Sequence, residues 1–269
     1  MNIYRAINEL LDNGNAGALC TIINTKGSTP RHEGSKILVY EDGSFIGTVG
    51  GGEIEQRVLK QALESMGDGK TRYLSYNMVD PARGDPGVCG GTVEVYVEPI
   101  LPKPSLVIIG GGHVGKAVTH LAKWLGFYTV VSDDRSEFCS QEENPEADAL
   151  YPVRMEELAN NMNINSTTYI VLTTRGSNID VEGMEPLLHS KAAYIGVIGS
   201  RRRWLATKKG LKEKGIPDEL LQKVHSPIGL ELKAETPEEI AVSILAEIIM
   251  LRNGGSGAHM KLEEKSNVE

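Results

Sequence analysis

The sequence predicts an α/β protein, with an N-terminal α+β domain followed by a C-terminal Rossmann-like domain that contains a parallel sheet. First, the stretch 110–115 fits G-x-G-x-x-G and stands between a short apolar run and a helix-spaced pattern. Second, apolar runs alternate with helical patterns beyond residue 104, which is typical of βαβ units. Third, the segment 99–104 contains three prolines, which resist both helix and sheet and therefore indicate a linker.

The composition narrows the class of protein. The chain has 269 residues and a net charge of −8, which argues against a general nucleic-acid-binding protein. No apolar run is long enough to cross a membrane, and the first eleven residues lack the apolar core of a signal peptide. The three cysteines have no paired spacing, which excludes a CxxC zinc site and favours a reducing cytoplasm.

The first half, 1–98, has the patterns of a small α+β domain. Apolar periodicity predicts a helix at 3–11, a strand at 18–23, a hairpin at 36–40 and 44–49, a helix at 54–65, a strand at 70–76, and an edge or hairpin strand at 92–97. Gly50, Gly51 and Gly52 connect the hairpin to the second helix. Their backbone N–H groups suit an anion-binding nest, although the same glycines also suit a flexible bend.

The second half is expected to fold as a doubly wound domain over 105–254, with a disordered tail at 255–269. Strands are predicted at 105–109, 127–131, 149–151, 169–173 and 194–198, a turn at 225–230, and a last helix that Thr236 and Glu239 open with a capping box. The carboxyl ends of parallel strands share one edge of a sheet. The turns 110–115, 173–180 and 199–203 should therefore face one cleft, with Thr173 in it.

The turn at 110–115 is the strongest candidate for a nucleotide site. Gly110 permits the tight turn, Gly112 lets a pyrophosphate approach the backbone, and Gly115 lets the helix pack on the sheet. The helix start at His113 and Val114 supplies N–H groups and positive dipole charge to an anion. A glycine-rich turn kept for packing alone is the other interpretation.

Acidic residues follow at the distance expected of a ribose ligand. Asp133 and Asp134 lie about 20 residues after the glycines, where a carboxylate accepts the ribose hydroxyls of a dinucleotide. This position favours NAD over NADP, although Arg135 beside them weakens that preference.

A cluster of arginines opens another predicted helix. Arg201, Arg202 and Arg203 follow Ser200 at its start, where each cation opposes the helix dipole at a cost of up to about 1 kcal/mol. A bound phosphate or the carboxylates of a partner would offset that cost. Arginines that simply face solvent are the other interpretation.

Several motifs, in a fixed order, carry a family resemblance. In the first half they are Gly27-Ser28-Thr29-Pro30-Arg31, Gly47-Thr48-Val49-Gly50-Gly51-Gly52 with Glu53 and Glu55, and Cys89-Gly90-Gly91. In the second half they are the glycine turn, Asp133-Asp134-Arg135, Tyr194-Ile195-Gly196 with Gly199-Ser200-Arg201, and Pro227-Ile228-Gly229-Leu230 with Thr236-Pro237-Glu238-Glu239. Over nearly its whole length the chain resembles the XdhC/CoxI family of accessory proteins for xanthine dehydrogenase and related molybdenum hydroxylases.

The resemblance implies a chaperone that binds the molybdopterin cofactor with its molybdenum, protects it during sulfuration and delivers it to an apo molybdenum hydroxylase. A cysteine desulfurase that sulfurates the cofactor, and a second copy of the chain in a homodimer, would be its partners. The implied cofactor contacts in the first half are Arg31, Gly50, Gly51, Gly52, Glu53 and Cys89. The Cys89 thiol would contact molybdenum or carry sulfur, although a thiol that only fills a turn is the alternative.

The chain departs from the family at one point, and one other function stays open. After the strand at 169–172 the family usually shows a Thr-His-Asp-like turn, whereas this chain has Thr173-Thr174-Arg175-Gly176. An NAD(P)-dependent oxidoreductase is the alternative function. It would explain the glycine turn and Asp133, but it leaves the first-half motifs unexplained and lacks an evident hydride-transfer partner.

Overall fold

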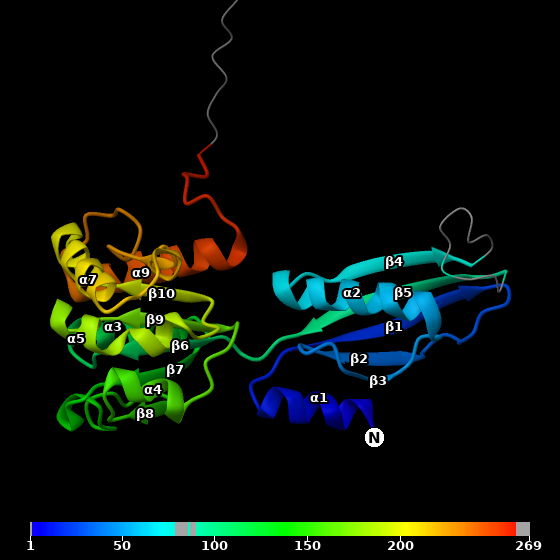
Figure 1. Cartoon of the computed structure of the whole chain (residues 1–269), viewed down its shortest axis with the longest axis horizontal. Helices are drawn as coiled ribbons and strands as arrows, with labels where there is room; N and C mark the ends of the chain where they lie inside the picture. The colour runs from blue at the N-terminus through cyan, green and yellow to red at the C-terminus, as the bar shows by residue number, and fades with distance from the viewer. Residues whose placement is uncertain (1, 79–85, 87–89, 262–269) are drawn as a thin grey trace, which may run out of the picture. The chain divides into compact units, whose positions relative to one another are not determined.

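The chain divides into two compact units, 1–103 and 104–269, and the division falls within the proline-rich segment (Figure 1). A computed structural model describes residues 2–78, 86 and 90–261 of the chain. Each unit has its own sheet and its own hydrophobic core. No described helix is long and apolar enough to span a membrane.

Unit 1 is built on an antiparallel sheet. Its elements are α1 (Ile3–Asp12), β1 (Gly17–Lys26), β2 (Lys36–Tyr40), β3 (Phe45–Gly47), α2 (Gly52–Asp68), β4 (Arg72–Asn77) and β5 (Thr92–Ile100). In the described part of this unit, five strands lie in the order β3-β2-β1-β5-β4, and each neighbouring pair is antiparallel. The buried side chains Ile54, Val58 and Ala62 of α2 pack on the apolar face of this sheet.

Strand β5 and the linker differ from the expectation. β5 pairs with β4 on one side and with β1 on the other, so it is a central strand rather than an edge strand. It also extends to Ile100, which places Pro99 in the sheet opposite Ala18. β4 pairs with β5 no further than Val97. Pro99 therefore has a neighbouring strand on one side only, which is where a sheet tolerates proline.

Unit 2 is built on a parallel sheet. Its elements are β6 (Ser105–Ile109), α3 (His113–Trp124), β7 (Tyr128–Ser132), η2 (Ser136–Phe138), β8 (Ala149–Tyr151), α4 (Met155–Asn161), β9 (Thr168–Leu172), α5 (Ser177–Gly183), α6 (Glu185–Leu188), β10 (Tyr194–Val197), α7 (Arg201–Glu213), α8 (Asp218–Leu221), β11 (Val224–His225) and α9 (Pro237–Asn253). Among its described residues, six strands pair in parallel in the order β11-β10-β9-β6-β7-β8.

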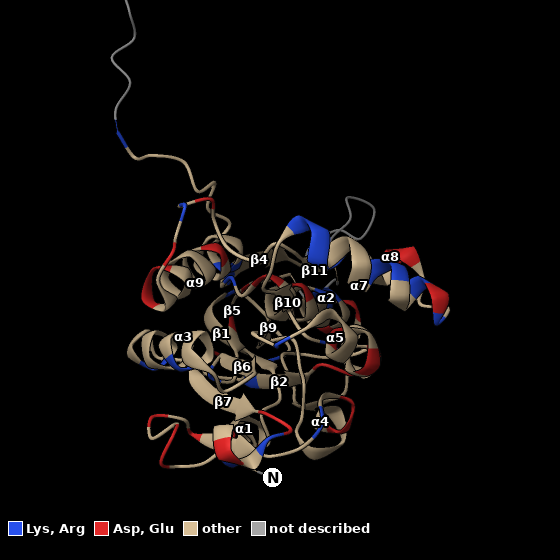
Figure 2. Cartoon of the chain, turned by 90° about the vertical axis from the view of Figure 1, so that its left-hand side faces the viewer, with Lys and Arg blue, Asp and Glu red and all other residues tan. Residues whose placement is uncertain are grey.

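This strand order is the one of doubly wound nucleotide-binding domains. Counted from β6 it reads 3-2-1-4-5-6, and it reverses between β6 and β9. Figure 2 shows α3 and α9 on one face of the sheet and α4, α5 and α7 on the other. Each face has a buried core of its own. The crevice for a ligand is therefore expected outside the carboxyl ends of β6 and β9.

The five strands predicted in unit 2 are confirmed, each to within one residue at either end. Strand β11 lies where a turn was expected, because two residues are too short to show an alternating pattern. The capping box of α9 is confirmed: Thr236 Oγ1 accepts a hydrogen bond from Glu239 N, and Glu239 Oε2 accepts one from Thr236 N. In the expected tail, residues 255–261 form no helix or strand, and 262–269 lie outside the described residues.

Candidate functional site

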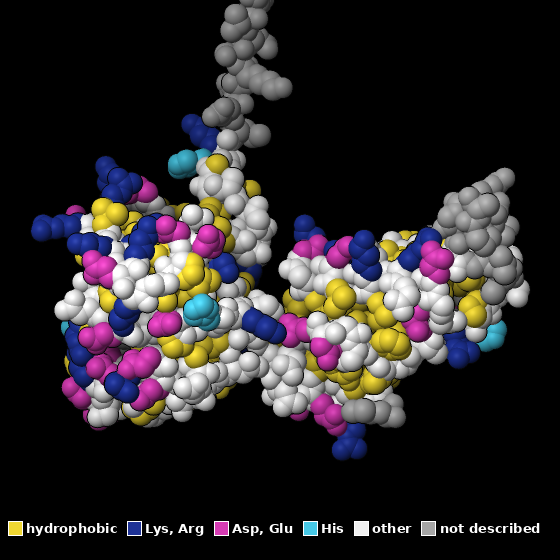
Figure 3. Space-filling view, viewed as in Figure 1, with side chains coloured by type: hydrophobic (Ala, Val, Ile, Leu, Met, Phe, Trp, Pro, Cys, Tyr) yellow, Lys and Arg dark blue, Asp and Glu magenta, His cyan; other side chains and the backbone are white. Residues whose placement is uncertain are grey.

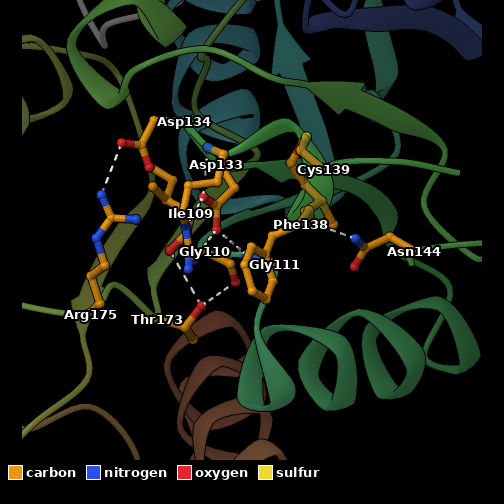
Figure 4. Close-up of polar contacts among 12 residues, drawn as sticks. Ile109, Gly110, Gly111, Asp133, Asp134, Phe138, Cys139, Asn144, Thr173 and Arg175 are labelled. Atoms are coloured by element: carbon orange, nitrogen blue, oxygen red, sulfur yellow. Dashed lines mark hydrogen bonds and ion pairs between the residues drawn. The ribbon is translucent and has the colours of Figure 1, made fainter. Parts of the chain in front are cut away.

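Three turns meet at the carboxyl edge of the parallel sheet in unit 2. They follow β6, β9 and β10, as the sequence predicts. The hydroxyl of Thr173 donates to Gly110 O at 2.7 Å and joins the first two turns. The guanidinium of Arg203 donates to Thr174 O at 2.9 Å and joins the second turn to the third. The Thr173 hydroxyl therefore makes its hydrogen bond within the protein and holds the glycine turn against the turn after β9 (Figure 4).

Packing explains some glycines of this turn but not all of them. A Cβ at Gly111 would lie 1.9 Å from Phe138 O, and one at Gly115 would lie 2.0 Å from Gly110 O, so neither position admits a side chain. Gly112 differs, because its φ of −73° suits any residue and a Cβ there would meet nothing within 4 Å. Open space therefore borders the turn at Gly112.

The start of α3 lies next to this open space. The N–H groups of its first turn, His113 to Gly115, have no acceptor within the helix, and no side chain caps them. An anion that approached the backbone at Gly112 would meet these donors and the positive end of the helix. The side chain of His113 instead lines a groove between α3 and α9.

Asp133 is already fully hydrogen-bonded within the protein. Its Oδ1 accepts from the backbone N and Nε of Arg135, both at 3.0 Å. Its Oδ2 accepts from Gly111 N at 3.0 Å and from Arg135 Nη2 at 2.9 Å. Burial opposes ionisation, but the hydrogen bonds from Arg135 and Gly111 outweigh it and hold the pKa of Asp133 below its usual range.

These four hydrogen bonds correct the expected role of Asp133. A carboxylate has about four acceptor positions, and all of them are filled here. The side chain is also only 3% exposed, so a ribose hydroxyl would have to displace a protein donor. Asp133 and Arg135, whose guanidinium also lies 3.8 Å over the ring of Phe138, thus hold the glycine turn in place.

Asp134 remains as the accessible carboxylate of this pair. Its Oδ2 lies 3.1 Å from Nη2 of Arg175, and the two side chains are 39% and 48% exposed. The ion pair joins the end of β7 to the end of β9 beside a pocket of about 160 Å³ (Figure 4). The pocket is lined by Ile109, Gly110, Asp133, Asp134, Arg135, Val153, Arg154, Met155, Glu156, Thr174, Arg175, Ile179 and Glu182.

The arginines at the start of α7 have different roles. Ser200 caps the helix, with its Oγ accepting from Arg203 N at 3.2 Å. Arg203 forms an ion pair with the fully buried Asp180 at 2.8 Å. Arg201 and Arg202 are exposed, and within the described part of the chain no ion pair involves them. Figure 2 shows Lys and Arg residues at the start of α7 in blue on the ribbon. On the face of unit 2 that Figure 3 shows, positive and negative side chains are interspersed.

Sequence reasoning missed the Arg203–Asp180 pair. Arg203 follows two exposed arginines and carries the same charge, so residue type alone does not distinguish it from them. The helical period does, because Arg203 lies four residues before the buried Thr207 and eight before the buried Leu211. A cation on the buried face of a helix requires a buried carboxylate, and Asp180 supplies it.

In unit 1, three of the sequence motifs meet at one end of the sheet. A Cβ at Gly91 would lie 2.3 Å from Ser28 O, so the backbone at 90–91 packs directly on the turn at 27–29. A Cβ at Gly50 would lie 2.8 Å from Pro30 Cγ, which places the 27–31 turn against the glycine-rich turn as well. Arg31 is exposed at this end, and Cys89 lies outside the described residues.

Part of the expected anion nest in unit 1 is occupied by side chains of the protein itself. Glu55 Oε2 accepts from Thr48 Oγ1 at 2.6 Å, from Val49 N at 3.2 Å and from Gly51 N at 3.4 Å. Gly50 N donates to Thr48 Oγ1 at 3.1 Å. Two of the expected nest donors therefore already have acceptors, because an acidic side chain in the first turn of a helix is drawn to such N–H groups.

Two further expectations for unit 1 concern Glu53 and a metal contact. Glu53 forms an exposed ion pair with Arg57, one turn further along α2. Among the described residues, no group of three or more His, Cys, Asp and Glu side chains is suited to hold a metal ion.

Two family profiles match the chain. Residues 106–248 match the XdhC Rossmann domain, and residues 10–77 match the XdhC and CoxI family. The chain belongs to the XdhC and CoxI family. The motifs at 27–31 and 47–52 lie within the first matched range and the glycine turn lies within the second, whereas Cys89-Gly90-Gly91 lies in neither.

Individual relatives agree with the XdhC and CoxI assignment. The chain is 33% identical to the uncharacterized protein YqeB of Escherichia coli over 97% of its length, and it spans about half (48%) of YqeB. It is 26% identical to a probable xanthine dehydrogenase subunit from Bacillus subtilis, covering 93% of the chain and 98% of the relative. It is 24% identical to the molybdenum cofactor insertion chaperone PaoD of Escherichia coli, covering 93% and 88%.

A solved structure shares the fold of this XdhC and CoxI protein. It is described as a xanthine dehydrogenase from Bacillus halodurans, and the match has a TM-score of 0.51 at 23% identity over 97% of this chain and 98% of that one.

The turn that departs from the family pattern has a clear structural role here. The Thr174 hydroxyl donates to Asp180 Oδ1 and accepts from Arg203 Nη2 at 2.6 Å. Thr174 thus completes the buried ion pair, while Arg175, the next residue, points to Asp134 at the rim of the pocket.

Proposed function

We propose that this chain binds the molybdenum cofactor, protects it during sulfuration and assists its insertion into xanthine dehydrogenase-type molybdenum hydroxylases. Family membership supports the proposal, as does the relative whose name is molybdenum cofactor insertion chaperone. The observation that carries it is the meeting of the 27–31, 50–52 and 90–91 segments at one end of unit 1. These segments are far apart in the sequence, and together with the exposed Arg31 they form a surface at which a ligand could be bound.

Each chemical part of the cofactor has a candidate partner. The molybdenum with its dithiolene sulfurs is soft, and a cysteine thiolate is a suitable contact for it, so Cys89 is the proposed contact in unit 1. The phosphate of molybdopterin is an anion, for which the open backbone at Gly112 and the donors of His113, Val114 and Gly115 are suited. Arg201 and Arg202 follow a turn at the same edge of that sheet and would add positive charge.

The partners follow from the same role. We propose an apo molybdenum hydroxylase as the recipient, a cysteine desulfurase as the sulfur donor, a homodimer as the working form and the cytoplasm as the compartment. An NAD-dependent reaction is the weaker alternative, because the carboxylate expected to hold the ribose, that of Asp133, already accepts four hydrogen bonds from protein donors.

The direct test measures whether the molybdenum cofactor accompanies the chain. The full chain is purified from cells supplied with molybdate, and its molybdenum content and the fluorescence of its oxidised pterin are measured. It is then mixed with an apo xanthine dehydrogenase, and the activity of that enzyme is followed. We expect molybdenum and pterin to accompany the chain and the enzyme to gain activity. A chain that carries neither, and that leaves the enzyme inactive, would refute the proposal.

A further inference from the structure

The Asp134–Arg175 ion pair stands at a pocket whose walls and rim differ in chemistry. Apolar side chains come from β6, from the segment after β8, from the start of α4 and from α5, and they are Ile109, Val153, Met155 and Ile179. Most of the remaining lining residues are charged. Asp134 supplies a carboxylate at the rim. Apolar side chains can cover the faces of a flat ring, and polar groups placed beside them can fix the orientation of its polar edge.

The size of the pocket limits its occupant. It encloses about 160 Å³, whereas sites for drug-sized ligands enclose roughly 300–1,000 Å³. A ring system therefore fits better than a whole cofactor. Gly110 lines the same pocket and begins the turn that leads to the open backbone at Gly112. A ring in the pocket would thus leave a phosphate attached to it near the start of α3.

The present partner of Asp134 indicates which ring edge it would accept. Asp134 Oδ2 accepts one hydrogen bond from Arg175 Nη2, at 3.1 Å. A carboxylate is also able to accept two parallel N–H donors from one planar group. A 2-amino-4-oxo-pyrimidine ring carries two such donors, in its ring N–H and its 2-amino group. This edge is common to pterins and guanine. Adenine and cytosine place an acceptor beside their amino group, so they offer one donor to a carboxylate.

We propose that this pocket binds the 2-amino-4-oxo edge of a pterin or of guanine, with Asp134 accepting hydrogen bonds from the ring N–H and the 2-amino group. This inference rests on the proposed function in one respect: the molybdenum cofactor contains a pterin. Arg175 leaves Asp134 when the ring enters and donates to the 4-oxo oxygen, since a guanidinium is a donor at every position. Asp133 does not compete for the ring, because its own acceptors are filled.

The test compares ring edges that differ by one group. The full chain is titrated by calorimetry with 6-hydroxymethylpterin and with its 2-oxo counterpart, 6-hydroxymethyl-lumazine. Guanosine and xanthosine monophosphates form a second matched pair, and AMP serves as the base without the edge. We expect the 2-amino member of at least one pair to bind at least tenfold more tightly than its 2-oxo counterpart and than AMP. A preference within the pterin pair identifies a pterin, and one confined to the nucleotide pair identifies a guanine nucleotide.

The variant Asp134→Asn sharpens the test, because an amide offers one acceptor and one donor. It should abolish the preference for the 2-amino ring and shift it toward the 2-oxo ring. Glu182→Gln is the matched control, since it removes another carboxylate from the lining of the same pocket and should keep the preference. Far-ultraviolet circular dichroism checks that both variants fold.

The outcomes separate this inference from the proposed function. Equal binding of the 2-amino and 2-oxo rings, or binding of none of them, in a chain that still carries molybdenum would overturn the pocket assignment and leave the chaperone function standing. A guanine preference that Asp134→Asn reverses, in a chain without molybdenum or pterin, would support the pocket assignment and refute the chaperone function.

Discussion

Asp133 is almost completely buried, and its carboxylate joins the end of β7 to the glycine turn through Gly111. A hydrogen bond to a charged group contributes roughly 1.5–3 kcal/mol, and a donor left without its acceptor costs about as much. The same reasoning applies to Glu55, which holds the 48–51 turn in unit 1. At the scale of single residues, two of the family motifs, the one around Gly50 and the one around Asp133, thus contain a carboxylate whose hydrogen bonds are made within the protein.

We expect Asp133→Asn to lower the free energy of unfolding at neutral pH by about 2 kcal/mol, because an amide oxygen cannot accept from all four donors. The pKa of Asp133 is lower in the folded chain than in the unfolded one. Its stabilisation is therefore complete above the unfolded value of about 3.9 and is lost as the pH falls through the folded value. Urea unfolding at a series of pH values should show the parent and the variant converge in acid.

The neighbouring carboxylate supplies the control for this series. Asp134→Asn changes a half-exposed side chain and should alter the free energy of unfolding by no more than about 0.5 kcal/mol. Equal losses of stability in the two variants at neutral pH would contradict the role assigned to Asp133.

Glu55→Ala should lower the free energy of unfolding by about 1–2 kcal/mol, because Thr48, Val49 and Gly51 all donate to its Oε2. Glu53→Ala is the matched control two residues away. It removes an exposed ion pair with Arg57 and should cost no more than about 0.5 kcal/mol. Thermal unfolding of both variants measures the difference, and a cost confined to Glu53→Ala would show that the carboxylate of Glu55 does not hold the turn.

At the scale of elements, α7 places cations where its own dipole disfavours them. Ser200 satisfies one N–H of the first turn and Arg203 has the buried Asp180, but Arg201 and Arg202 face outward beside the same helix end. A helix start with two exposed cations is less stable than the same helix with neutral residues there. Retaining them makes sense if an anion, on a ligand or on the hydroxylase, meets them.

The double variant Arg201→Gln and Arg202→Gln should therefore raise the free energy of unfolding, by up to about 1 kcal/mol for each residue, and weaken activation of the apo hydroxylase severalfold. Lys209→Gln is the control, since Lys209 is exposed further along α7 and pairs with Glu213. It should change neither property appreciably. A lower melting temperature with full activation in the double variant would mean that the two arginines serve the fold.

At the scale of the whole molecule, the two units divide the proposed chemistry between them. In the proposal, unit 1 supplies the Cys89 thiol and Arg31, and unit 2 supplies the open backbone at Gly112 and the pocket beside Asp134. Of the three cysteines, Cys20 is a poor candidate for the thiolate, because burial raises its pKa to about 12. Cys139 is buried as well, with its Sγ donating to Val131 O.

Cys89→Ser should keep the fold and lower the molybdenum carried per chain at least severalfold, because a hydroxyl is a poor contact for a soft metal centre. Cys139→Ala is the control and should carry as much molybdenum as the parent. Elemental analysis of the purified proteins and activation of the apo hydroxylase are the two readouts. Molybdenum content and activation equal to the parent in Cys89→Ser would show that the thiol only fills its turn.

Much of the architecture was readable from the sequence, because local patterns are enough to determine it. The G-x-G-x-x-G turn after an apolar run, the βαβ alternation and the capping box at Thr236 each depend on residues close in the chain, and the structure contains all three. The same holds for the first-half hairpin and for the family, whose motifs occur in a fixed order. The central position of β5 was not readable, since a strand pattern does not tell which strands flank it.

Only the tertiary structure decided which polar groups are available to a ligand. Asp133 and Asp134 are adjacent and chemically identical. The carboxylate of Asp133 accepts hydrogen bonds from Gly111 and Arg135, whereas the carboxylate of Asp134 is accessible beside a pocket. Gly112 and Gly111 look alike in sequence, but only Gly111 is explained by a neighbour, Phe138, that folding brings to it. The physical reason is that hydrogen bonding and steric contact depend on distances between residues far apart in the chain, which no local pattern encodes.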